Sequence, residues 1–405
     1  GYKVKHVMNI TDVGHLVSDA DEGEDKLEKG AKREGKTVWE VAQHYTDTFK
    51  KDMAALNVIE PNAYTSKKYK DSYARATEFI DEQIEMVKVL LDKGFAYQTE
   101  QAIYFEVSKL PDYGILTGQR LADKEVAARK EVVTDKSKRS PYDFAVWFFT
   151  VGHFREHSMH WPSPWGNGFP GWHLECSAII HALLGDPIDI HTGGIDHIGT
   201  HHPNEMAQTE ACFGYQLSKF WVHNEFVLVD GHKMSKSKQN AYTLADVGKH
   251  GFSPLEYRLL ALQAHYRTEL NFSWDNLAAA KNRLKNLRDF ADLKHQAGEA
   301  FKDMAPGYFD KLRTEIKDVM ATDLKTPDAL RILSESIDYI DNSTGGGINP
   351  ADVSAFSNFL ELLDELLGLD LANRADITKT QRDLLQQRQA ARNAKDWPAS
   401  DKLRE

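Results

Sequence analysis

The chain has 405 residues, 41% hydrophobic and 27% charged, which is the composition of an ordinary globular protein of two or three domains. We find no apolar run of about 20 residues and no charged-then-apolar leader, so we expect neither a membrane span nor a secretory signal. Its two cysteines are too few for a disulfide scaffold and suit a cytoplasmic protein. The net charge of −11 means that any contact with nucleic acid must be a local basic patch.

The first part of the chain predicts alternating strands and helices. We expect a short strand at residues 4–10 and then, at 19–36, a charge-rich segment that is either a solvated loop or a mobile insertion. Apolar residues recur at helical spacing in residues 39–56 and 72–91, which predicts two helices there.

Further along, strands are expected at residues 97–107 and 130–133, and an apolar run returns at 143–149. Residues 161–171 are rich in Pro, Gly and Trp and predict a rigid loop. A helix should open after Gly171, a strand should end near His191, and a second helix should open near His201.

A possible metal site lies on the two predicted helix starts. His201 and Glu205 are four residues apart, so on a helix they project from one face and can reach one ion. With Cys176 they form a thiolate, imidazole and carboxylate set suited to zinc. The alternative is a buried structural cysteine beside a helix start that is rich in His and Glu.

A strand at residues 226–229 runs into a turn and then into Lys233-Met234-Ser235-Lys236-Ser237. The two ammonium groups of this pentapeptide suit phosphoryl oxygens, and a lysine can follow a departing pyrophosphate. The alternative is a solvated charged loop.

The carboxy-terminal third predicts helices, one of them over residues 276–293. Its basic residues could contact nucleic-acid phosphates, or they could simply form a solvated face; they are Lys281, Arg283, Lys285 and Arg288. A later apolar stripe predicts a helical bundle; it comprises Leu360, Leu362, Leu363, Leu366 and Leu367.

These motifs, in this order, resemble those of the cysteinyl-tRNA synthetases, a family of class I aminoacyl-tRNA synthetases. The resemblance rests on Asn9-Ile-Thr-Asp12, Trp161-Pro-Ser-Pro-Trp165-Gly, Gly171-Trp-His-Leu-Glu-Cys176, Asp189-Ile-His-Thr-Gly-Gly194, His201-His-Pro-Asn-Glu205 and the KMSKS pentapeptide. It implies an α/β fold with a Rossmann-like parallel sheet and a helical and strand insertion, followed by an all-α helical bundle. The implied divisions are a catalytic domain at 1–225 with a connective insertion at about 40–150, a KMSKS-containing linking region at 226–275, and an anticodon-binding region at 276–405.

The resemblance also implies the reaction. Cysteine and ATP, with Mg²⁺, would form cysteinyl-adenylate, and the cysteinyl group would pass to tRNA(Cys) on a cytoplasmic protein that we expect to be a monomer. One zinc ion per subunit would select cysteine over serine. The implied site residues are Cys176, His201 and Glu205 for zinc, Trp172 and Thr11 for the amino acid, Gly193, Gly194, Asp196 and Lys236 for ATP, and Lys233 and Lys236 for catalysis.

The family also carries a His-Ile-Gly-His signature and a further zinc cysteine near its first strand. His197-Ile198-Gly199-Thr200 is similar to that signature, but it lies too close to KMSKS, so we reject it. We expect the true signature and the first zinc cysteine to precede Gly1, and the anticodon-reading end to continue beyond Glu405.

Two other interpretations stay open. A related ligase joins cysteine to a glucosamine-inositol in mycothiol synthesis and also activates cysteine at a zinc site, although the helical bundle disfavours it. A non-catalytic truncated paralogue would instead be a binding module for zinc or tRNA.

Overall fold

The computed structural model describes residues 2–14, 25–118, 135–185, 187–234 and 240–404. The chain divides into two compact units, and each is described by itself. The first comprises residues 1–227 and 266–269, and the second comprises 228–265 and 270–405. Our three-part division of the chain stays a prediction. Among the residues described, no helix is both long and apolar enough to span a bilayer.

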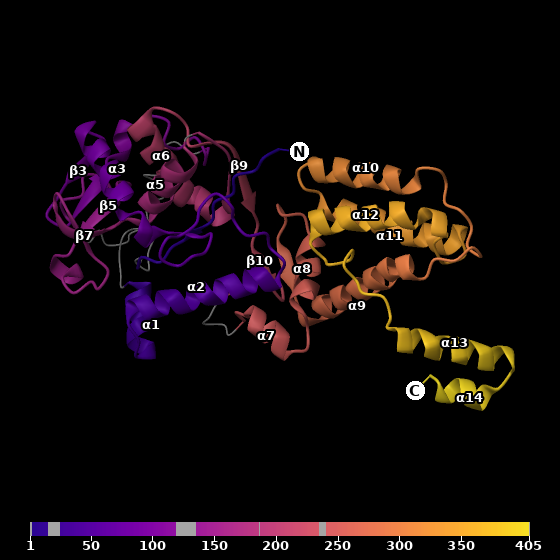
Figure 1. Ribbon diagram of the computed structural model, residues 1–405. Helices are drawn as coiled ribbons and strands as arrows, with labels where there is room; N and C mark the ends of the chain where they lie inside the picture. Colours follow the sequence, from indigo (N-terminus) through magenta and orange to yellow (C-terminus); the bar gives the residue numbers. More distant parts are fainter. Residues whose placement is uncertain (1, 15–24, 119–134, 186, 235–239, 405) are drawn as a thin grey trace. The chain divides into compact units, whose positions relative to one another are not determined.

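The first unit mixes short strands with helices, shown in indigo to magenta in Figure 1. Its strands are β1 (Asn9–Ile10), β2 (Ala74–Arg75), β3 (Ala96–Gln98), β4 (Ala102–Phe105), β5 (Phe144–Phe149), β6 (Trp161–Ser163), β7 (Gly166–Pro170), β8 (Ile188–Gly194) and β9 (Ser218–Asn224). Its helices are α1 (Lys26–Glu34), α2 (Val38–Ala55), α3 (Ile80–Asp92), α5 (Trp172–Leu184) and α6 (His201–Phe213). Short 3₁₀ turns are η1 (Ala76–Glu78), η2 (Val107–Lys109), η3 (Gly152–Phe154) and η4 (Ile195–Gly199).

Among the described residues of this unit, parallel pairing occurs in two places. Strand β1 pairs with β2, and β8 pairs with β9 over the register Ile188↔Ser218 to Gly194↔Asn224. Helix α6 lies between β8 and β9 in the chain, so these three elements form a βαβ crossover of the kind that parallel sheets require. Helices α5 and α6 pack against each other.

The antiparallel sheet of this unit has the order β3-β4-β5-β7-β6. Every residue of β5 is buried, and Trp147 and Phe105 are among the largest side chains of the surrounding core. Our expectation of a rigid loop at residues 161–171 is wrong. Strands β6 and β7 form a hairpin there, because Pro164 and Trp165 form a two-residue turn, Gly166 adopts a φ of +125° directly after it, and β7 pairs with β5.

Two further predictions differ from the structure near the beginning of the chain. Strand pairing is confined to Asn9 and Ile10 instead of extending over residues 4–10. The charged segment contains helix α1, because the Asp25 carboxylate accepts hydrogen bonds from the Leu27 and Glu28 N–H groups and Gly35 ends the helix with a φ of +64°. Residues 19–24 of that segment, and the strand expected at 130–133, lie outside the described residues.

The second unit contains a small sheet that includes the start of the pentapeptide. Its strands are β10 (Val227–Val229), β11 (His232–Lys233) and β12 (Leu270–Phe272), in the order β11-β10-β12. Asp230 and Gly231 have φ values of +49° and +74°, the combination that a two-residue hairpin turn requires. The predicted strand and turn are therefore confirmed.

Helices make up the rest of the second unit, orange to yellow in Figure 1. They are α7 (Leu244–Lys249), α8 (Pro254–Leu262), α9 (Trp274–Ala291), α10 (Tyr308–Ala321), α11 (Thr326–Ser343), α12 (Val353–Leu367), α13 (Lys379–Asn393) and α14 (Trp397–Lys402), with the 3₁₀ turns η6 (Asp292–His295) and η7 (Pro350–Asp352). Their common core includes Leu360 and Leu363 of the predicted apolar stripe, both fully buried. The predicted helical bundle is confirmed.

Candidate functional site

The candidate site is built on the first turns of α5 and α6. Gly171 precedes α5, and a Cβ atom there would lie 2.0 Å from the Ala145 carbonyl oxygen, so only glycine lets the helix start this close to β5. Trp172 and Cys176 are four residues apart on α5, as His201 and Glu205 are on α6, so each pair occupies one helix face. Both helix starts agree with the sequence-based expectation.

The structure brings Cys176, His201 and Glu205 together. Ligand atoms of these three side chains all lie within 4.8 Å of one another. Glu205 is fully buried, and its Oε1 lies 2.6 Å from Nε2 of His201. A buried carboxylate beside a thiol and an imidazole is a donor set that fits zinc, so the residues present suit the ion that the sequence predicts. Their role as ligands stays a prediction.

A second group shares the same carboxylate. His191 on β8 and His202 on α6 have ring nitrogens within 4.8 Å of each other and of Glu205. Glu205 Oε2 lies 3.0 Å from His191 Nε2, so each carboxylate oxygen faces a different imidazole. Only the first group contains a sulfur ligand, which favours zinc over harder cations there. Neither histidine is among the site residues expected from the sequence.

The Glu205 carboxylate is common to both groups, and its surroundings favour the ionised form. Burial would raise the pKa of Glu205, but the imidazoles of His191 and His201 hold it well below its usual range. Burial raises the pKa of the Cys176 thiol, and the carboxylates of Glu205 and Glu175 raise it further. A bound divalent cation would instead lower the pKa of the Cys176 thiol, because a coordinating thiol loses its proton.

Other imidazoles hold these groups in place. Nδ1 of His201 lies 2.8 Å from Nδ1 of His173, and Nδ1 of His202 lies 2.8 Å from Nε2 of His223 on β9. The Trp172 ring centre lies 4.5 Å from that of His201. Burial lowers the pKa of His202 to about 3, so this ring is neutral and can only share one hydrogen with His223. Such contacts fix ring orientation and tautomer.

The end of β8 has no room for side chains. A Cβ atom on Gly193 would lie 2.6 Å from Cε1 of His202, and one on Gly194 would lie 2.3 Å from Oδ1 of Asp196. Asp196 is exposed on η4, the turn that also contains most of the rejected His197-Ile198-Gly199-Thr200 segment. Thr11, just after β1, is exposed, and its hydroxyl accepts a hydrogen bond from Nδ2 of Asn9 at 3.3 Å.

Comparison with known proteins decides the family. A family model described as tRNA synthetases class I (C) catalytic domain matches residues 1–282. Cysteine–tRNA ligase 1 of Burkholderia lata is 42% identical over 410 residues, which cover 100% of this chain and 81% of the relative. The cysteine–tRNA ligase of Treponema denticola is 38% identical over 438 residues, covering 100% of this chain and 84% of the relative.

The chain belongs to the class I cysteine–tRNA ligases. The resemblance stated from the motifs is therefore confirmed, as is the assignment to the aminoacyl-tRNA synthetases, which are ligases. Methionyl-tRNA synthetase of Mycobacterium tuberculosis bound by methionyl-adenylate has a similar fold, with a TM-score of 0.60 at 14% identity over 91% of this chain and 85% of that one. A second structure of that enzyme gives 0.57 at 13% identity over 85% and 82%. These likenesses confirm the predicted α/β class I fold with a helical carboxy-terminal region.

The pentapeptide that identifies class I synthetases is described only at its start. Lys233 lies on β11 and is exposed, and its carbonyl oxygen accepts a hydrogen bond from Nδ2 of Asn240 at 3.3 Å. Lys236 lies outside the described residues. Lys233 belongs to the second unit, whereas Gly193, Gly194 and Asp196 belong to the first. The roles of all five stay predictions.

The basic residues of α9 are engaged within the second unit. Lys281 Nζ donates to the Gly251 carbonyl oxygen at 3.0 Å, and Arg283 donates to that of Leu330 at 3.0 Å. Lys285 pairs with Asp289 at 2.6 Å. Most of this basic row therefore has a structural partner, which weakens its case as a phosphate-binding surface.

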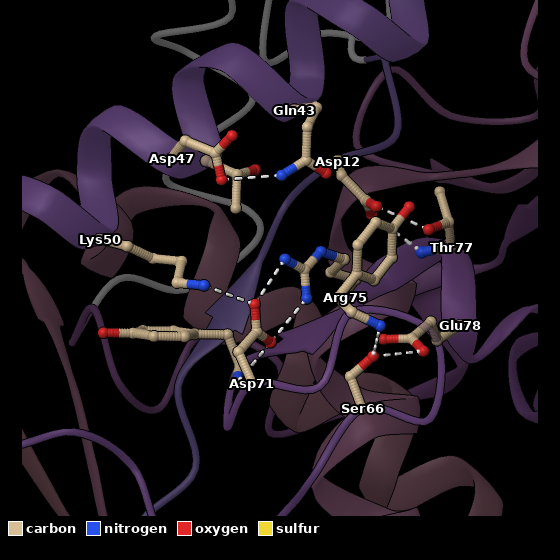
Figure 2. Close-up of polar contacts among 12 residues, drawn as sticks. Asp12, Gln43, Asp47, Lys50, Ser66, Asp71, Arg75, Thr77 and Glu78 are labelled. Atoms are coloured by element: carbon tan, nitrogen blue, oxygen red, sulfur yellow. Dashed lines mark hydrogen bonds and ion pairs between the residues drawn. The ribbon is translucent and has the colours of Figure 1, made fainter.

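The first unit also contains a cavity of about 130 Å³. It is lined by Asp12, Trp39, Ala42, Gln43, Thr46, Lys68, Tyr69 and Arg75. Figure 2 shows the polar contacts around it, in which the Asp12 carboxylate accepts hydrogen bonds from the Thr77 N–H at 2.9 Å and the Thr77 hydroxyl at 2.6 Å. Burial raises the pKa of Asp12 to about 6. No predicted site residue lines this cavity.

Proposed function

We propose that this protein joins L-cysteine to tRNA(Cys) in two steps. The cysteine carboxylate attacks the α-phosphorus of ATP, which arrives with Mg²⁺, and pyrophosphate leaves. A hydroxyl of the terminal adenosine of the tRNA then attacks the carbonyl carbon, and AMP leaves. The observation that carries the proposal is the group formed by Cys176, His201 and Glu205 in a chain of the cysteine–tRNA ligase family.

Selection of the amino acid requires more than a shaped pocket. Cysteine and serine differ by one atom, and a pocket alone discriminates poorly between such close analogues. Zinc held by Cys176, His201 and Glu205 would bind the substrate sulfur as a thiolate, which the harder and less acidic serine hydroxyl cannot match. Trp172, whose ring lies against His201, would line the amino-acid pocket, and Thr11 would contact the substrate through its hydroxyl.

Catalysis requires that ATP is held in position and that the negative charge of its phosphates is neutralised, since the reaction uses no protein nucleophile. Lys233 and Lys236 would contact the phosphates, with Lys236 following the departing pyrophosphate. Gly193 and Gly194 would let the adenosine approach the end of β8, and the exposed Asp196 carboxylate would accept hydrogen bonds from the ribose hydroxyls.

The helical bundle is consistent with tRNA as the second substrate. We place its anticodon contacts in the region from 276 onward, and we propose that the protein acts as a monomer in the cytoplasm. Cys176 and Cys212 are both free thiols, which suits a reducing compartment.

The test compares the two cysteines. Cys176→Ser should lose bound zinc and cysteine-dependent exchange of pyrophosphate into ATP together. Cys212→Ser is the matched control, because Cys212 is buried on α6 and its thiol donates to the Met86 carbonyl oxygen at 3.7 Å, and it belongs to neither ligand group found in the described chain. Zinc is measured by elemental analysis, and exchange is measured with labelled pyrophosphate.

Each outcome decides between the alternatives. Full exchange by Cys176→Ser without zinc contradicts the metal assignment. Zinc binding without any exchange, measured on the full product of the gene, supports a non-catalytic binding module. Transfer of cysteine to a glucosamine-inositol instead of tRNA supports the mycothiol-type ligase.

A further inference from the structure

Asn9 reaches the candidate metal site from a distant part of the chain. It lies on β1, where it is paired in register with Ala74 of β2. Its side-chain nitrogen lies 3.5 Å from the sulfur of Cys176, which is 167 residues away in the sequence, and 3.3 Å from the Thr11 hydroxyl oxygen. One amide group thus touches both a predicted zinc ligand and a predicted substrate contact.

The chemistry of the side chain fits this position. A carboxamide nitrogen carries two hydrogens, so Nδ2 of Asn9 can donate one to the sulfur and one to the hydroxyl. A serine or threonine hydroxyl has a single hydrogen, and a carboxylate has none and would repel a thiolate. Because the amide is neutral, it orients the sulfur without adding charge to the site.

We propose that Asn9 is a positioning residue of the metal centre, which donates a hydrogen bond to the Cys176 sulfur and a second one to the Thr11 hydroxyl. The proposal rests on the proposed function, in which Cys176 is a zinc ligand. The first bond fixes the direction from which the sulfur binds the ion and stabilises its negative charge. The second bond keeps the Thr11 hydroxyl, which would contact the substrate, at a fixed position relative to that ion.

The bond to sulfur has a measurable consequence. Groups that orient a metal ligand are worth roughly 10-fold to 100-fold in metal affinity when they are removed. We therefore expect loss of the Asn9 amide to weaken zinc binding in the absence of any substrate. Loss of the bond to Thr11 should raise the KM for cysteine more than it lowers kcat.

The experiment uses Asn9→Leu, which keeps the size of the side chain and removes both donors. Asn62→Leu is the matched control. The Asn62 carboxamide accepts from the His6 N–H at 2.8 Å and donates to the Val4 carbonyl oxygen at 3.2 Å, so it ties down the same segment of chain and belongs to neither ligand group. The zinc dissociation constant is measured by competition with a chelator, and Co²⁺ reports the sulfur bond through its thiolate charge-transfer band.

The expected result is a zinc dissociation constant raised about 10-fold to 100-fold in Asn9→Leu, together with a shifted or weakened Co²⁺ band. Asn62→Leu should leave both unchanged even if it unfolds more easily. The proposal would be overturned if Asn9→Leu had the zinc dissociation constant and the Co²⁺ band of the parent, or if both variants lost zinc affinity equally. If Asn9→Leu does not fold, as judged by far-ultraviolet circular dichroism, Asn9→Ala replaces it and is held to the same criteria.

Cys176→Ser separates this proposal from the proposed function. Loss of zinc in Cys176→Ser with parent affinity in Asn9→Leu contradicts only the role of Asn9. Retention of zinc in Cys176→Ser contradicts the metal assignment itself, and with it the role of Asn9.

Discussion

The Arg75 guanidinium donates one hydrogen bond of 2.8 Å to each carboxylate oxygen of Asp71, as Figure 2 shows. The same guanidinium lies 3.7 Å from the centre of the Tyr69 ring. Lys50 adds a third contact to Asp71 at 2.7 Å. The Arg75 side chain is only 2% exposed, so this pairing anchors the segment that contains β2, the partner of β1.

Replacement of Arg75 by lysine should therefore destabilise the protein. A lysine keeps the charge but can neither bind both oxygens of Asp71 in a fork nor stack on Tyr69. We expect Arg75→Lys to lower the free energy of unfolding by about 2 kcal/mol, measured by denaturant titration. Lys88→Met is the control, because Lys88 and Glu85 form an exposed pair whose loss should change stability by less than about 0.5 kcal/mol. Equal effects in the two variants would contradict the assigned role.

Asp12 should make stability depend on pH. Burial raises its pKa from 3.8 to about 6, so between these values the folded protein takes up a proton and the free energy of unfolding falls as pH rises. Asp12→Asn carries no charge; its carbonyl oxygen can still accept from the Thr77 N–H, while its Nδ2 would donate to the Thr77 hydroxyl instead of accepting from it. Relative to the parent, the variant should therefore gain about 3 kcal/mol between about pH 4 and pH 7, as measured by denaturant titration at each pH.

The control for this measurement is Asp246→Asn. Lys249 and Thr243 lower the pKa of Asp246, so its contribution to stability is lost as pH falls. Relative to the parent, the free energy of unfolding of Asp246→Asn should therefore fall as pH rises, whereas that of Asp12→Asn should rise. A parent and an Asp12→Asn variant with parallel pH profiles would show that the Asp12 carboxyl titrates normally.

Local signals were enough to predict part of the fold. Gly171 marks the start of α5 because no side chain fits against Ala145, and Asp230-Gly231 marks a hairpin because both residues adopt a positive φ. Strand β1 could not be delimited in this way. Its two residues pair with β2, at Ala74 and Arg75, and nothing in the local pattern of residues 4–10 encodes that partner.

The candidate site was likewise only partly predictable from local sequence signals. The helical spacing of His201 and Glu205 pairs them, Cys176 completes a donor set suited to zinc, and the family resemblance implies the same three ligands. Asn9 and His191 lie within motifs whose sequence indicates no role for them, because their contacts depend on how β1 and β8 lie against the two helices. Contacts of this kind are tertiary, so spacing along one element does not reveal them.

Gly193 offers a test of the close packing at the end of β8. A methyl group there would meet Cε1 of His202 at 2.6 Å and Nδ1 of His197 at 2.8 Å, and the bond to His223 limits how far the first ring can move. We expect Gly193→Ala to lower cysteine-dependent pyrophosphate exchange by about 100-fold, because small displacements at a reacting centre have effects of that order. In Gly199→Ala the added methyl group meets nothing within 4 Å, so exchange should stay within about twofold of the parent. Similar activities in the two variants would remove Gly193 from the nucleotide site.

The core of the second unit should respond strongly to the loss of one side chain. Leu363 is fully buried on α12 among the helices of the bundle, whereas Leu384 on α13 is 41% exposed. Leu363→Ala leaves a cavity and should lower the free energy of unfolding by about 3 kcal/mol, while Leu384→Ala should change it by less than about 0.5 kcal/mol. Circular dichroism during denaturant titration measures both, because the second unit is mainly helical. If the two substitutions cost the same, the bundle does not pack around α12 in the way that the structure indicates.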